Sequence, residues 1–183
     1  GKRTLLIDCD LRKSSIARVF GLEKEPGVTD VIVGNHSWRN VVRTVTDIVG
    51  TGMGMGEIVQ IPGGDNLHII TSGTIPPNPT ELLDSRHMAD FVSEVREAYD
   101  VVLFDSVPIL HVADAAILGK MMDCAIIVCR AGDVARSSLK RSTRLLRSVG
   151  IEILGVVING TRADLTGDFQ DPNYNAHYTY GSD

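Results

Sequence analysis

The sequence is poor in the features that mark membrane spans, disulfide frameworks and electrostatic nucleic-acid binders. No apolar run approaches the roughly 20 residues that cross a bilayer, and no secretory signal opens the chain. Three cysteines are too few for a disulfide framework, so we expect a reducing, cytoplasmic compartment. A net charge of −5 argues against a nucleic-acid partner, because binding to phosphate backbones needs clustered Lys and Arg.

Motifs of several enzyme classes are missing as well. There is no Gly-x-Ser-x-Gly element of a serine hydrolase, and no histidine has the i, i+4 partner of a zinc helix. A phosphate-binding loop of the form Gly-x-x-x-x-Gly-Lys-Ser/Thr is also absent. Gly1-Lys2 precedes a predicted strand instead of following one, and Gly119-Lys120 is followed by methionine. A nucleotide site built from these residues alone would lack the usual cradle for phosphates.

What the sequence does contain is the pattern of one α/β domain. It has 183 residues, of which 43% are hydrophobic. Near-continuous apolar runs, typical of strands buried on both faces of a parallel sheet, cover residues 4–8, 67–71, 101–105, 124–129 and 153–158. Helical periodicity predicts helices over 80–98 and 137–149. Strands alternating with helices predict a mostly parallel sheet flanked by helices.

Two regions lie outside this pattern. Residues 50–64 are rich in glycine and are predicted to form a loop. Residues 161–183 are polar and lack periodicity, so we expect a flexible tail that contains Tyr174, Tyr178 and Tyr180, while the α/β domain covers residues 1–160. The first strand starts almost at residue 1, which fits either an open sheet or a domain whose opening strand and helix have been cut off.

Two predicted strands end in carboxylates. Asp8 and Asp10 stand at the end of the first strand, in residues 5–12, and Asp105 ends the strand in residues 101–108. The carboxyl ends of parallel strands form the ligand-binding edge of such a sheet. Close carboxylates repel unless a cation lies between them, and Mg²⁺, which brings phosphates, is a natural partner. An alternative is that Asp10 only caps the following helix, but the two acidic strand ends together favour a nucleotide and Mg²⁺ site.

These motifs resemble those of one family. Residues 5–12 resemble the Walker A′ motif, and residues 102–108 the Walker B motif, of bacterial tyrosine autokinases, which are P-loop proteins related to the ParA/MinD ATPases. The Pro-Pro-Asn-Pro-Thr-Glu-Leu-Leu stretch at 76–83 is similar to another segment of that family. So are the segments at 114–118, 128–132 and 154–159, in the expected order. The resemblance covers residues 1–160 and implies a partial, N-terminally truncated P-loop NTPase-like fold without its Walker A segment.

The resemblance implies a protein-tyrosine kinase domain that uses ATP and Mg²⁺. It would transfer the γ-phosphoryl group to tyrosines of a neighbouring protomer and so regulate exopolysaccharide or capsule synthesis and export. The residues implied to bind Mg²⁺ and serve catalysis are Asp8, Asp10 and Asp105, with one of the first two accepting the phenolic proton. Arg12 and Asn159 would contact the nucleotide. The phosphoacceptors would be Tyr174, Tyr178 and Tyr180.

The resemblance also implies partners and a location. The partners are further copies in a homo-oligomeric ring, a membrane polysaccharide co-polymerase or adaptor segment, and a tyrosine phosphatase. The location is the cytoplasmic side of the cell, at the inner face of the cell membrane. The missing phosphate loop implies that the chain as given is inactive. Two alternatives are a ParA/MinD-like ATPase, which gives no reason for the Pro-Pro-Asn-Pro segment or the tyrosines, and a degenerate regulatory module, which would leave three acids without a cation.

Overall fold

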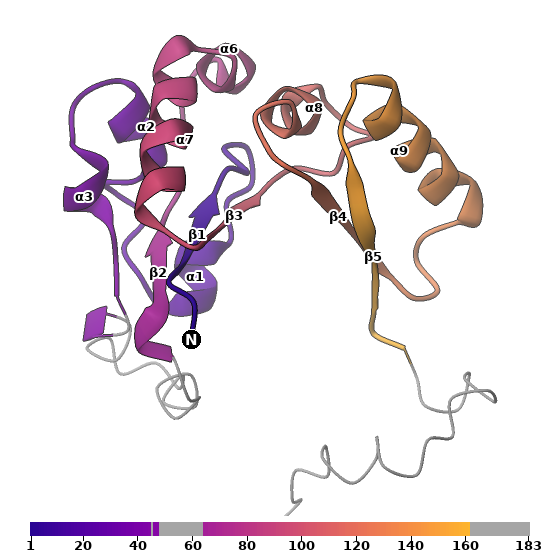
Figure 1. Ribbon diagram of the computed structural model, residues 1–183, viewed down its shortest axis with the longest axis horizontal. Coiled ribbons are helices and arrows are strands. Elements are labelled where there is room, and N and C mark those ends of the chain that lie inside the picture. The colour runs from indigo at the N-terminus through magenta and orange to yellow at the C-terminus, as the bar shows by residue number, and fades with distance from the viewer. Residues whose placement is uncertain (45, 48–63, 162–183) are drawn as a thin grey trace, which may run out of the picture.

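The protein contains two parallel sheets (Figure 1). The computed structural model describes residues 1–44, 46–47 and 64–161. One sheet has the strand order β2-β1-β3, and the other pairs β4 with β5. The strands are β1 (Thr4–Asp8), β2 (Leu67–Ile70), β3 (Val101–Asp105), β4 (Ala125–Arg130) and β5 (Ile153–Asn159). Each lies within one residue of its predicted bounds, so the predicted parallel α/β architecture is confirmed. The predicted loop at 50–64, apart from Gly64, and the predicted tail beyond Thr161 lie outside the described residues.

The structure contains helices beyond the two that were predicted, and one of those two is divided. The helices are α1 (Ile16–Phe20), α2 (Val28–Ile32), α3 (Trp38–Val41), the 3-10 helix η1 (Gly64–Asn66), α6 (Pro79–Leu83), α7 (Arg86–Ala98), α8 (Asp114–Gly119) and α9 (Arg136–Ser148). The single helix predicted over 80–98 is wrong, because Ser85 adopts an extended conformation and its hydroxyl accepts the N–H of Met88 at 3.2 Å. This capping bond ends α6 and starts α7. Within the described ranges, no helix is long and apolar enough to cross a membrane.

Helices cover both faces of the sheet β2-β1-β3. Leu5 and Ile7 of β1 are fully buried and belong to a cluster that includes residues of α2, α3 and α7. Leu6 points to the opposite face and packs with Ile16 and Phe20 of α1. Successive side chains of β1 therefore enter two separate apolar clusters, one on each face of the sheet, as the continuous apolar runs predict.

The sheet β4-β5 is incompletely covered in the part of the chain that the structure describes. Helix α9 packs against β5 and buries Leu146. Large apolar side chains of both strands stay exposed, and the register, which pairs Val128 with Val157 and Ile127 with Val156, places them on both faces of the sheet: Ile126, Val128, Leu154, Val156, Val157 and Ile158. The prediction that these strands are buried on both faces is therefore wrong for the described residues. Exposed apolar side chains gathered in this way are typical of a surface that contacts another element or chain.

Candidate functional site

The two acid-ended strands are direct neighbours. In the parallel register of β1 and β3, Asp8 lies opposite Asp105, and the N–H of Cys9 donates to the carbonyl of Asp105 at 2.8 Å. Both carboxyl ends therefore open onto the same edge of the sheet, as predicted. This is the edge at which open parallel sheets bind ligands.

Backbone N–H groups organise the turn that follows β1. Asp8 is fully buried, and its carboxylate accepts the N–H of Asp10 at 3.2 Å and that of Ile16 at 3.1 Å. Asp10 accepts the N–H groups of Arg12 at 3.1 Å and Lys13 at 2.8 Å on a single oxygen, Oδ1. Asp10 thus stabilises the turn, while Asp8 is the carboxylate that meets the first residue of α1. The capping role considered for Asp10 falls to Asp8.

Burial and neighbouring negative charge raise the pKa values of Asp8 and Asp105. Burial raises the pKa of Asp8, and the charge of Asp105 adds to the effect, although the N–H of Ile16 opposes it. Partial desolvation raises the pKa of Asp105, followed by the charge of Asp10. Burial, and then these carboxylates, raise the pKa of the Cys9 thiol, so that Cys9 stays neutral. The edge is therefore a place where positive charge is favoured.

The carboxylates fit Mg²⁺ by their chemistry. They are hard oxygen donors, and Mg²⁺ in phosphoryl-transfer sites takes only one or two protein carboxylates, with water and phosphates completing its shell. Among the described residues, no three His, Cys, Asp or Glu side chains are gathered closely enough to hold a metal ion. The complete set of Asp8, Asp10 and Asp105 as metal ligands therefore stays a prediction.

We expect Asp105→Asn to raise the melting temperature of the protein at pH 7 in EDTA. The folded-state pKa of Asp105 lies above its ordinary value of 3.8. The protonated carboxyl therefore stabilises the fold fully at pH values below 3.8, and this stabilisation is lost as the pH rises through the folded-state pKa. Ionised Asp105 therefore lowers stability at neutral pH, and an amide does not. Thermal unfolding at pH 7 and below pH 3.8, with exposed Asp133→Asn as control, tests this. A gain of equal size at both pH values would rule out charge as its cause.

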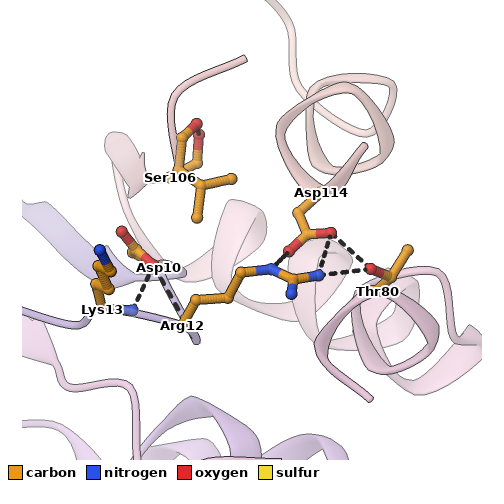
Figure 2. Close-up of polar contacts among 7 residues, drawn as sticks. Asp10, Arg12, Lys13, Thr80, Ser106 and Asp114 are labelled. Carbon is orange, nitrogen blue, oxygen red and sulfur yellow. Dashed lines mark hydrogen bonds and ion pairs between the residues drawn. The ribbon is translucent and has the colours of Figure 1, made fainter. Parts of the chain in front are cut away.

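Arg12 reaches across the edge to two other elements (Figure 2). Its Nε donates to Asp114 Oδ2 at 2.7 Å, and its Nη2 donates to Asp114 Oδ1 at 3.2 Å and to the hydroxyl of Thr80 at 3.0 Å. The Thr80 hydroxyl itself donates to Asp114 Oδ1 at 2.7 Å. We call Arg12, Thr80 and Asp114 the Arg12 network. Asp114 is 2% exposed, and the guanidinium holds the pKa of its carboxyl below the usual value.

The chain approaches Thr80 through a tightly packed loop. Gly73, which follows β2, has a φ of +79°, and a Cβ there would lie 2.4 Å from both Thr29 Oγ1 and Asp30 Oδ2. Only glycine fits this conformation and this space. Asp30 also accepts the hydroxyl of Thr74 at 3.1 Å, so α2 fixes the start of the segment that delivers Thr80.

Asn159 lies apart from the carboxylates at the β1–β3 edge. Asn159 ends β5 in the other sheet, and its Oδ1 accepts the N–H of Gly160 at 2.8 Å. In residues 1–44, 46–47 and 64–161, no hydrogen bond links Asn159 to the acidic strand ends, so its nucleotide contact stays a prediction. The predicted acceptors lie outside the described residues: Tyr174, Tyr178 and Tyr180.

The sequence did not point to Thr80 or Asp114 as site residues. Thr80 lies at the start of a predicted helix, and Asp114 begins a helix instead of ending a strand. The available signal was that each lies in a segment of the family resemblance, at 76–83 and 114–118. Neither segment by itself shows which side chain it would meet.

Comparison with known proteins places the chain among kinases. It is 36% identical over 162 residues to the tyrosine-protein kinase YwqD of Bacillus subtilis (strain 168), and the matched region covers 88% of this chain and 61% of that protein. It is 32% identical over 182 residues to the tyrosine-protein kinase wzc of Salmonella typhi, and the matched region covers 100% of this chain and 23% of that protein. The chain thus spans less than two thirds of the length of these curated relatives. No family model matches it.

Solved structures agree with these relatives. The VpsO kinase domain superposes with a TM-score of 0.75 at 30% identity, covering 88% of this chain and 71% of that one. MinD of Aquifex aeolicus, in its complex with MinC, superposes with a TM-score of 0.67 at 20% identity, covering 91% of this chain and 60% of that one. The MinD similarity shows the fold alone and confirms the predicted P-loop NTPase-like architecture. By its similarity to the VpsO kinase domain and to the curated kinases, the chain belongs to the family of bacterial tyrosine-protein kinases.

Proposed function

We propose that these residues are part of a protein-tyrosine kinase domain that binds Mg²⁺-ATP at the edge formed by β1 and β3 and phosphorylates tyrosines of a neighbouring copy. The observation that carries the proposal is the pairing of Asp8 with Asp105 at the carboxyl ends of adjacent parallel strands. Phosphoryl transfer needs positioning and charge neutralisation more than covalent chemistry, and a cluster of carboxylates with Mg²⁺ supplies both.

The three carboxylates are assigned different roles by their surroundings. Bound Mg²⁺-ATP supplies the phosphoryl group and offsets the negative charge at the edge. Asp8, fully buried with backbone donors on its carboxylate, orients the turn. Among the described residues, Asp10 accepts hydrogen bonds on Oδ1 alone, so its Oδ2 is the oxygen we assign to the phenolic proton. Asp105, exposed at the end of β3, is the carboxylate that would hold Mg²⁺.

The acceptors and partners follow from the family. We propose Tyr174, Tyr178 and Tyr180 as phosphoacceptors, in a homo-oligomer at the inner face of the cell membrane. A membrane polysaccharide co-polymerase segment and a tyrosine phosphatase are the other proposed partners. Each phosphorylation adds about −1.5 to −2 charges, enough to weaken contacts between copies through repulsion. Control of exopolysaccharide or capsule synthesis and export is the proposed outcome.

Residues 1–183 are proposed to be inactive alone. Their sequence holds no Gly-x-x-x-x-Gly-Lys-Ser/Thr loop, so the main cradle for the ATP phosphates must come from elsewhere in the whole protein. The exposed apolar side chains of β4 and β5 support this, because they offer a surface on which a further segment can pack.

The test compares residues 1–183 with the full-length protein, both incubated with Mg²⁺-ATP and analysed for phosphotyrosine by mass spectrometry. We expect label on the tail tyrosines in the full-length protein and none in residues 1–183. A full-length protein that hydrolyses ATP but carries no phosphotyrosine would contradict the kinase assignment and favour a MinD-like ATPase. A full-length protein that binds no nucleotide would favour the degenerate regulatory module.

A further inference from the structure

The Arg12 network joins three segments that are distant in the sequence. Arg12 lies in the turn after β1, Thr80 in the first turn of α6, and Asp114 at the start of α8. Helices α6 and α8 are in contact with each other, and Figure 1 shows them side by side. The guanidinium of Arg12 extends from the turn that carries Asp10 and bonds to both helices, to Thr80 of α6 and to Asp114 of α8 (Figure 2).

The network is built with satisfied, directional bonds. The Thr80 hydroxyl accepts from Arg12 and donates to Asp114, so both of its hydrogen-bonding functions are used. Asp114 is nearly inaccessible to solvent, and its carboxylate accepts hydrogen bonds from two guanidinium nitrogens of Arg12. A planar guanidinium held by a carboxylate in this way has a fixed orientation. By contrast, the surface pair of Arg86 and Asp90 on α7 is 3.9 Å apart, with side chains that are 93% and 61% exposed.

The same arginine also touches Asp10 through its backbone. The N–H of Arg12 donates to Asp10 Oδ1, as does the N–H of Lys13. Anchoring the Arg12 side chain on α6 and α8 therefore fixes the backbone that holds the Asp10 carboxylate. Two of the three guanidinium nitrogens are engaged within the network, which argues against a primary contact with the nucleotide.

We propose that Arg12, Thr80 and Asp114 are positioning residues that hold the Asp10 carboxylate in the orientation required for phosphoryl transfer. Thr80 then gives the Pro-Pro-Asn-Pro-Thr segment a role in the site, because the prolines set the approach by which its hydroxyl reaches Asp114. The role of Asp10 in transfer rests on the kinase function proposed above, whereas the hold on its backbone does not.

The test uses four variants of the full-length protein. Thr80→Val removes the hydroxyl at nearly constant volume, and Thr80→Ser keeps it. Asp114→Asn removes the charge that holds Arg12. Thr143→Val is the matched control, because the Thr143 hydroxyl donates to the Leu139 carbonyl of its own helix α9 at 2.9 Å. Two readouts are taken: kcat and KM for ATP, and hydrogen exchange at the amides of Arg12 and Lys13.

We expect Thr80→Val to lower kcat about 10-fold and Asp114→Asn to lower it on the order of 100-fold, with little change in KM for ATP. Exchange at the Arg12 and Lys13 amides should accelerate in both, while Thr80→Ser recovers most of the rate and Thr143→Val resembles the wild type. Global thermal unfolding, followed in parallel, separates a local loss from misfolding.

Three results would overturn the proposal. They are exchange in Thr80→Val equal to that in Thr143→Val, Thr80→Ser as impaired as Thr80→Val, or a raised KM for ATP with kcat intact. A wild-type protein without kinase activity would instead overturn the proposed function, and the exchange measurement would still decide whether the Arg12 network holds Asp10.

Discussion

Replacing Asp10 with asparagine in the full-length protein is expected to lower the rate of tyrosine phosphorylation roughly 10²- to 10⁴-fold, the range typical of a lost general base. An amide of the same shape can still accept the N–H groups of Arg12 and Lys13 on one oxygen, so the turn is retained. What is lost is the negative charge and the oxygen assigned to the phenolic proton. The measurement is the initial rate of phosphotyrosine formation at saturating Mg²⁺-ATP.

Asp90→Asn is the matched control for this variant. Asp90 lies on α7 with a 61% exposed side chain and pairs only loosely with Arg86. Its replacement should leave the rate unchanged, since exposed ion pairs of this kind contribute little. If Asp10→Asn kept a rate within twofold of the Asp90→Asn control, Asp10 would have no part in catalysis, and its assignment as the group that accepts the phenolic proton would be wrong.

The second large effect concerns the acceptors. Changing Tyr174, Tyr178 and Tyr180 together to phenylalanine is expected to remove nearly all autophosphorylation while leaving ATP hydrolysis intact, because the change removes the acceptor oxygens and none of the strand-end carboxylates. Quantitative phosphotyrosine mass spectrometry and a phosphate-release assay on the same samples measure the two activities separately.

Tyr99→Phe provides the control for the acceptor variant. Tyr99 is partly buried, and its hydroxyl lies 2.7 Å from Nδ1 of His68. Burial raises the pKa of this phenol. Label in Tyr99→Phe should equal that in the wild type. Substantial phosphotyrosine remaining in the triple variant would show that the acceptors lie elsewhere in the protein.

The strands were predictable because the signal is local. Each is a short, nearly continuous apolar run, and the acids that end β1 and β3 are visible in the same stretch of sequence. The break between α6 and α7 was not predictable, because Leu82, Leu83 and Met88 keep a helical spacing across it. One side-chain bond, from Ser85 to the N–H of Met88, overrides that periodicity.

The Arg12 network could not be predicted for a different reason. Arg12 and Asp114 are 102 positions apart, and Thr80 and Asp114 are 34 apart, so no local pattern joins them. The exposed apolar side chains of β4 and β5 show a related limit. A continuous apolar run predicts that a strand is to be covered on both faces, but it does not say which segment supplies the cover.

The central claim is that strand-end carboxylates of one copy phosphorylate tail tyrosines of another. It is tested by mixing two full-length variants that are each unable to label themselves, with Mg²⁺-ATP. One carries Asp105→Asn with its tyrosines intact. The other has intact carboxylates but phenylalanine at Tyr174, Tyr178 and Tyr180, and an isotope label distinguishes its peptides. We predict phosphotyrosine on the tail of the Asp105→Asn chain only in the mixture. No label in the mixture, with the wild-type protein labelled normally, would contradict transfer between copies through these carboxylates.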